Sequence, residues 1–129
     1  MIPKSPGEIV DTWSILRMKA VLIPDLFCEV LQYQGVVSGM FYEKPEIFAP
    51  VACIIEMNAR IWMLEASIRS GEITDSELVE IGKRAIKIRD YNARRVEAKV
   101  AIDKIFGHKG IDAKVEHRSV VKEGKDGTS

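Results

Sequence analysis

The chain has 129 residues, of which 47% are hydrophobic and 29% are charged, with 19 basic and 19 acidic side chains. This length is typical of one domain, and the apolar fraction excludes a globally disordered chain. A net charge of zero lacks the basic excess that is typical of a dedicated nucleic-acid or membrane-surface binder.

Targeting and redox signals point to a cytoplasmic protein. No apolar run approaches the roughly 18 residues of a transmembrane helix, and the first residues do not resemble a signal peptide. Cys28 and Cys53 lie in apolar segments, which favours reduced core thiols.

The first helix is expected to begin at Ser5-Pro6-Gly7-Glu8. This segment combines an N-cap serine, a proline at the first helical position and a glutamate at the third. Apolar residues then recur at helical spacing, and Pro24 is expected to end or kink the helix because it lacks a backbone donor.

The next segment is harder to interpret. A second helical piece is predicted over residues 25–34, with Gly35 as its stop. Residues 35–49 are apolar but contain two glycines and a proline, so they are expected to form a loop packed on the core. A lid or a subunit contact is the alternative.

Two further long helices are predicted over residues 46–70 and 75–106. The first has a seam of apolar residues with coiled-coil spacing, and the second opens with the capping box Thr74-Asp75-Ser76-Glu77 and stops at Gly107. A helix over residues 75–106 is about 48 Å long. A compact monomer of this size has a radius of gyration of only about 14 Å, so the helix would overhang. The overhang predicts a dimer or larger homo-oligomer.

The C-terminal region changes pattern after Gly110. Apolar residues alternate with polar ones from Ile111 to His117, which favours a short strand or extended arm. Residues 122–129 are expected to be a disordered tail, so residues 1–121 form a single domain. The predicted fold is all-α, with three long helices in an antiparallel bundle and a short extended C-terminal arm.

Polar residues interrupt the apolar seam of the third long helix. Asn92, Arg95 and Lys99 occupy positions where the period demands apolar residues, beside Val96 and Val100. A buried cation costs several kcal/mol unless it is paired, so these cations need carboxylates, a bound anion or water.

The other two long helices carry matching polar stripes. Helical spacing places Asn58, Trp62, Glu65 and Arg69 on one face, and Glu8, Asp11, Ile15 and Lys19 on another. These stripes could form a self-neutralised buried network. The excess of cations, the planar guanidinium of Arg95 and the indole of Trp62 instead favour an anionic ligand, such as a nucleotide or phosphate ester.

Several of these residues carry a family resemblance. Gly7-Glu8-Ile9-Val10-Asp11, with Ser14-Ile15-Leu16 and Lys19 after it, resembles the signature G-E-φ-φ-D-K-φ-S/T-I-L-x-φ-K. This signature belongs to a family of small helical bacterial and phage proteins catalogued only as a domain of unknown function. Residues 58–69 are similar to the family's N-x-x-φ-W-x-φ-E-x-x-I-R pattern.

The resemblance also includes Asn92, Arg95 and Ile102-Asp103, and it spans most of residues 6–107. The chain departs from the family at Thr12, where lysine is usual, and in residues 35–49. The resemblance implies a helical fold and marks the polar stripes, and it implies no particular activity.

The sequence gives little support for a metal site or for nucleophilic catalysis. His108 and His117 are not at ligand spacing, and no cysteine pair has zinc spacing, so no metal and no cofactor are expected. No nucleophile motif or glycine-rich phosphate loop is present. The remaining enzymatic alternative is a small hydrolase or transferase that uses Glu8 and Asp11 for general acid–base catalysis.

The sequence therefore favours a non-enzymatic protein that binds a small anionic, nucleotide-like ligand, with a possible role in sequestration. Arg95, Lys99 and Arg69 are expected to bind the anion, and Asn92 and Asn58 to recognise polar edges. Trp62 would stack on the ligand, while Glu65 and Asp11 orient the cations. Glu8 and Lys19 complete the predicted site. The alternative is a structural or interaction protein whose polar network only sets the helix register.

Overall fold

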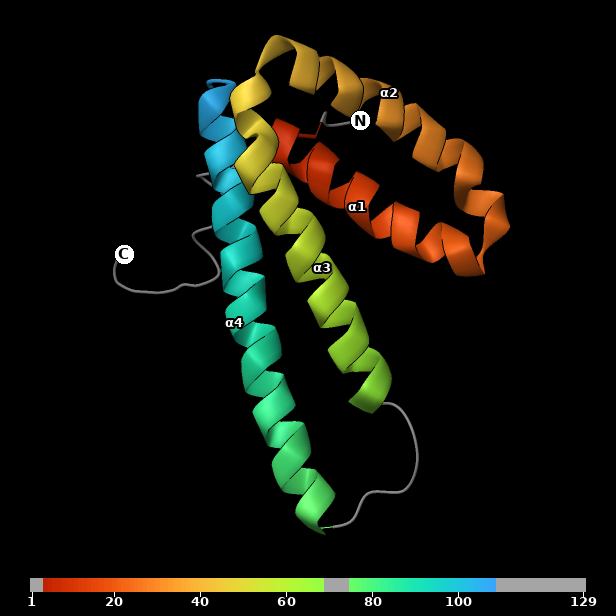
Figure 1. Ribbon diagram of the computed structural model, residues 1–129, viewed down its shortest axis with the longest axis vertical. Helices are drawn as coiled ribbons and strands as arrows, with labels where there is room; N and C mark the ends of the chain where they lie inside the picture. The colour runs from red at the N-terminus through yellow and green to blue at the C-terminus, as the bar shows by residue number, and fades with distance from the viewer. Residues whose placement is uncertain (1–3, 69–74, 109–129) are drawn as a thin grey trace.

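The computed structural model describes residues 4–68 and 75–108, and these residues form four α-helices, two single 3₁₀ turns and no strand. The helices are α1 (Pro6–Leu22), α2 (Phe27–Glu43), α3 (Phe48–Ile68) and α4 (Asp75–Ile105). Helices α1 and α2 form one antiparallel hairpin, which lies across one end of the longer α3–α4 hairpin (Figure 1). The all-α prediction is confirmed, and the predicted three-helix count is wrong because α2 is a full helix.

The start of α1 agrees with the sequence prediction. The Ser5 hydroxyl accepts a hydrogen bond from the Glu8 amide at 3.2 Å. Pro6 has no amide hydrogen, and the Gly7 amide donates to the buried Asp103 carboxylate of α4 at 2.7 Å. The free donors of the first turn are therefore satisfied, and one partner comes from a distant helix. The helix ends at Leu22, just before Pro24, as predicted.

Helix α2 is longer than predicted because Gly35 does not stop it. The helix continues through Gly35 and Gly39 to Glu43. A glycine inside a helix costs only about 1 kcal/mol relative to alanine. Burial of Val37 and Met40 on the same helix offsets that cost. The predicted loop over residues 35–49 is therefore mostly helical, with a 3₁₀ turn at Pro45–Ile47 before α3.

Helix α3 is the most apolar element. Together with the preceding turn, Pro45–Ala66 has 22 residues and a mean hydropathy of 1.5, enough by length and composition to cross a membrane. Within the structure, 28% of the most apolar window of this segment is buried, and α3 packs against α1 and α4 and carries the buried Asn58. This segment was not expected from the sequence, because charged residues interrupt its apolar run.

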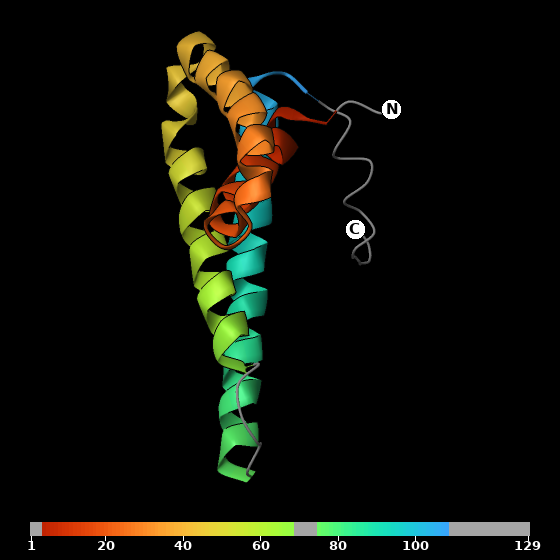
Figure 2. The ribbon, with the colours of Figure 1, turned by 90° about the vertical axis from the view of Figure 1, so that its right-hand side faces the viewer.

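Helix α4 ends where the sequence predicted. Gly107 has a φ of 73°, a conformation that favours glycine. The amide of His108 donates to the Asp103 carbonyl, and that of Gly107 donates to the Lys104 carbonyl. This pair of bonds is a Schellman motif, which satisfies carbonyls of the last turn. The opposite end of α4 extends well beyond α1 and α2, with α3 alongside (Figure 2).

The core lies where the two hairpins meet. Its buried side chains come from all four helices and from the turn before α3: Val10, Trp13, Val37, Met40, Ile47, Val51, Ile54, Ala98 and Ile102. Trp13 also donates from its indole nitrogen to the Gln34 side chain at 3.1 Å, which links α1 to α2. This end of the molecule fixes how α1 crosses α3 and α4, and so positions the polar stripes.

Other sequence predictions have mixed outcomes. Cys28 is exposed on α2, so its assignment to the core is wrong, whereas Cys53 is half-buried; both are free thiols. The cap at Thr74, the arm over residues 111–117 and the tail over residues 122–129 lie outside the described residues.

Candidate functional site

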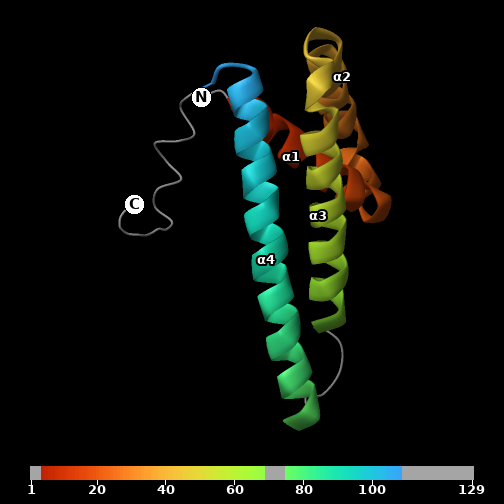
Figure 3. The same cartoon turned by 60° about the vertical axis from the view of Figure 1, so that its left-hand side comes forward.

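A cavity of about 300 Å³ lies between α1, α3 and α4. Figure 3 shows α3 and α4 side by side with α1 crossing them. The apolar part of the wall consists of Ile15, Met18, Ile61 and Ile88. The remaining lining residues carry a ring, a charge or an amide: Lys19, Asn58, Trp62, Glu65, Asn92 and Arg95. The cavity thus combines an apolar wall with a few polar groups, as small-molecule sites do.

A polar network lies beside the cavity and shares Asn58 and Arg95 with its lining. Asp11 is its centre: Oδ1 accepts from the Asn58 amide at 2.9 Å and lies 3.6 Å from Arg95 Nη1. The other carboxylate oxygen lies 3.4 Å from Lys99 Nζ, which also pairs with Glu8 at 2.6 Å. Both Asp11 oxygens therefore have partners, and one buried carboxylate joins three helices.

Asn58 completes this network. Its amide nitrogen donates to Asp11 and, at 3.2 Å, to the Ser14 hydroxyl, while its oxygen accepts from Arg95 at 3.3 Å. Asn58 is 4% exposed, so its oxygen and nitrogen are both engaged within the protein. The Asn58 side chain therefore has little hydrogen-bonding capacity left for the polar edge of a ligand, which was its predicted role. Its contacts are explained by a structural role.

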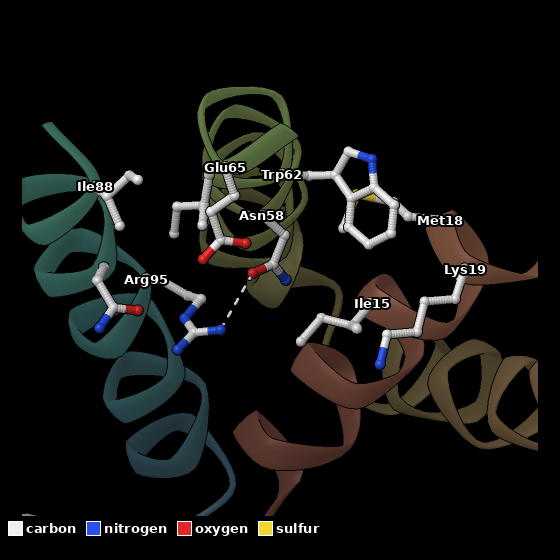
Figure 4. A pocket seen from close by; sticks show the side chains of 10 residues that line it. Ile15, Met18, Lys19, Asn58, Trp62, Glu65, Ile88 and Arg95 are labelled. Carbon is white, nitrogen blue, oxygen red and sulfur yellow. Dashed lines mark hydrogen bonds between the residues drawn. The ribbon is translucent and has the colours of Figure 1, made fainter. Parts of the chain in front are cut away.

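Arg95 is only partly satisfied. Its Nη1 contacts Asn58 and Asp11, whereas its Nε is buried and has no hydrogen-bond partner in the described structure. The side chain is 22% exposed and lines the cavity. Figure 4 shows the guanidinium beside Asn58, with Trp62 and Met18 on the other side of α3 from α4. A guanidinium with unused donors is suited to a carboxylate or phosphate.

The structure divides the predicted site into three groups. Lys19, Asn58, Trp62, Glu65, Asn92 and Arg95 line the cavity. Glu8, Asp11 and Lys99 belong to the ion-pair network beside it. Arg69 lies outside the described residues. The six charged members that the structure describes are three acids and three bases, so the predicted excess of cations depended on Arg69.

Two buried polar residues near the site, Ser14 and Asp103, were quoted in the family resemblance but were not predicted as site residues. Ser14 is buried and accepts from Asn58, and it lies three residues after Asp11 on the same face of α1. Asp103 continues the α4 stripe at four residues beyond Lys99, and its Oδ2 is buried without a hydrogen-bond partner in the described structure. In both cases the helical spacing of the polar stripe was the available signal.

A separate contact joins α3 and α4 outside the cavity. Arg60 donates to the Tyr91 hydroxyl at 3.3 Å and pairs with Glu56 at 2.7 Å. The Tyr91 hydrogen bond and the Glu56 carboxylate raise the pKa of Arg60. The contact between Arg60 and Tyr91 links α3 to α4.

Comparisons of the chain with protein-family models, curated proteins and solved structures find no match. The resemblance to a family of unknown function therefore stays a prediction. The function of this chain must be inferred from the cavity and the polar network themselves.

Proposed function

We propose that the chain is a non-enzymatic protein that binds a small anionic, nucleotide-like ligand in the cavity between α1, α3 and α4. The observation that carries the proposal is Arg95, which lines the cavity, is 22% exposed, and has partners within the described structure at Nη1 alone. The part of the guanidinium that is exposed to the cavity still has N–H donors without a partner in the described structure, and an anion in the cavity would accept from them.

The lining suits a ligand that has a flat ring and a negative charge. Trp62 provides a stacking surface, and the apolar wall accommodates the ring. Arg95 and Lys19 attract the anion, while the Glu65 carboxylate and the Asn92 amide are suited to donors and acceptors on the ring edge. The volume of about 300 Å³ is at the lower end of the range for small-molecule sites.

The network beside the cavity supports a second function, which is structural. Asp11, Asn58 and Lys99 are all paired within the protein, as expected for a network that sets the helix register. In our proposal this network is the rigid base of the ligand site. If it were the whole purpose of the polar stripes, the chain would be a structural or interaction protein.

Acid–base catalysis by Glu8 and Asp11 has less support. Both carboxylates pair with the same lysine, Lys99, and neither lines the cavity. A general acid or base must lie within hydrogen-bond reach of a substrate proton. A hydrolase or transferase using these two groups would therefore require a different substrate position.

A ligand screen on the parent and three variants tests the proposal. Nucleoside mono-, di- and cyclic phosphates, free nucleosides and inorganic phosphate are each added, and the free energy of unfolding is measured. A ligand at 100 times its Kd is expected to stabilise the parent by about 2.7 kcal/mol. Arg95→Met should abolish this effect and Trp62→Ala should weaken it. The control Met63→Ala, at a neighbouring exposed position on α3, should leave it unchanged.

The same screen separates the two functions. Without ligand, Arg95→Met should cost about 1–3 kcal/mol, because the buried Asn58 oxygen loses its donor while Asp11 keeps Asn58 and Lys99 as partners. If no nucleotide stabilises the parent and Arg95→Met instead costs about 3–5 kcal/mol, the structural function is correct.

A further inference from the structure

The distal half of α4 presents an apolar face to solvent. Leu78, Val79 and Ile86 are 55%, 62% and 53% exposed. They share one side of the helix with Gly82, because the positions follow the three- and four-residue spacing of a helix face. Tyr91, which contacts α3, is nine residues beyond Gly82 and so lies about 180° round the helix. This face therefore points away from α3, and Figure 2 shows that α1 and α2 do not reach it.

Two charged residues bound this distal face. Asp75 lies seven residues before Gly82, and Arg89 lies seven residues after it, both on the same side of the helix. Arg89 is 76% exposed, and its neighbour Asp90 is its ion-pair partner at 3.5 Å. Both side chains of that pair are largely exposed, so the pair is weak. Asp75 and Arg89 are about 21 Å apart along the helix, so they cannot pair with each other within one chain.

We infer that the distal face of α4 binds a second copy of this chain, with the two α4 helices antiparallel and related by a two-fold axis at Gly82. In that arrangement Asp75 of each chain faces Arg89 of the other. Leu78 and Ile86, each four residues from Gly82, likewise face each other across the axis. A two-fold interface requires such self-complementarity, in which each contact occurs twice.

Gly82 itself supports the position of the axis. A Cβ at Gly82 would meet no atom within 4 Å, so no contact within the chain requires a glycine there. A glycine inside a helix costs about 1 kcal/mol relative to alanine. At the crossing point of two helices it allows the backbones to approach closely, which gives this glycine a function.

The molar mass of the full chain in solution, measured by sedimentation velocity, tests the inference. The parent is expected at twice the chain mass of 14.5 kDa. Ile86→Glu should raise the dimer Kd by about 100-fold or more, since the buried charge is present twice in the interface. Lys87→Glu, at an exposed position on another side of α4, is the matched control and should remain dimeric.

A charge exchange tests the register and does not depend on the folding of Ile86→Glu. Asp75→Arg and Arg89→Asp should each weaken the homodimer, because like charges then face each other. A mixture of the two variants should form a heterodimer, and the double variant should dimerise again. A monomeric parent at micromolar concentration overturns the inference. A parent dimer that is insensitive to Ile86→Glu also overturns the inference and places the contact elsewhere. Single charge variants that are not rescued by mixing or by the double variant overturn it too, and assign the face to another partner.

Discussion

Replacing Gly7 by alanine is expected to lower the free energy of unfolding by about 3–5 kcal/mol. A Cβ at Gly7 would collide with the backbone carbonyl of Lys99, and a backbone atom of a packed helix cannot move aside as a flexible side chain can. If α1 shifts to relieve the collision, the hydrogen bond from the Gly7 amide to Asp103 is lost inside the core. Urea unfolding followed by circular dichroism measures the change.

Gly35→Ala provides the matched control for this substitution. Gly35 is also within a helix, but a Cβ there would meet no atom within 4 Å. The same chemical change should therefore stabilise the protein by about 0.5–1 kcal/mol. Equal effects of the two substitutions would contradict the close approach of α1 to α4.

The second large effect is expected for Asp11→Ala, which should lower the free energy of unfolding by about 3–5 kcal/mol. The change removes the carboxylate that accepts from Asn58 and pairs with Arg95 and Lys99. Lys99 keeps Glu8, whereas Arg95 keeps only the Asn58 oxygen among these partners. A half-buried cation is then left uncompensated. The same urea unfolding experiment gives the magnitude.

Glu56→Ala is the control for Asp11→Ala. It also removes a carboxylate from an ion pair, but the Glu56–Arg60 pair is half exposed on the surface of α3. Such a pair contributes less than about 1 kcal/mol. A loss for Asp11→Ala as small as that for Glu56→Ala would show that the network does not hold the three helices together.

The sequence predicted the helices whose ends are marked by local chemistry. The start of α1 is marked by an N-cap serine and the end of α4 by a glycine, so nearby residues were enough to predict both positions. The same logic failed at Gly35, where long-range packing of Val37 and Met40 overrides a local stop signal. Only the tertiary structure reveals that packing, so the sequence predicted a short helical piece over residues 25–34 and not the full length of α2.

The site was predicted in part for a similar reason. Helical spacing identified which polar residues share a face, and six of the ten predicted residues line one cavity. Spacing does not reveal which face of one helix meets which face of another. It therefore could not separate the network at Asp11 from the cavity at Trp62, or place the Asp103 carboxylate at the start of α1.

The fluorescence of Trp62 tests the ligand site most directly. Trp13 is the only other tryptophan, so Trp13→Phe leaves Trp62 as the single reporter. Circular dichroism first establishes that this variant is folded. We expect nucleotides to quench the fluorescence with a saturable curve, and nucleosides without phosphate to bind at least about 10-fold more weakly because they lack the charge that Arg95 recognises. Adding Arg95→Met should reduce that difference, with Lys19 left as the remaining cation of the cavity. A folded variant whose Trp62 fluorescence shows no saturable change with any nucleotide would contradict the account.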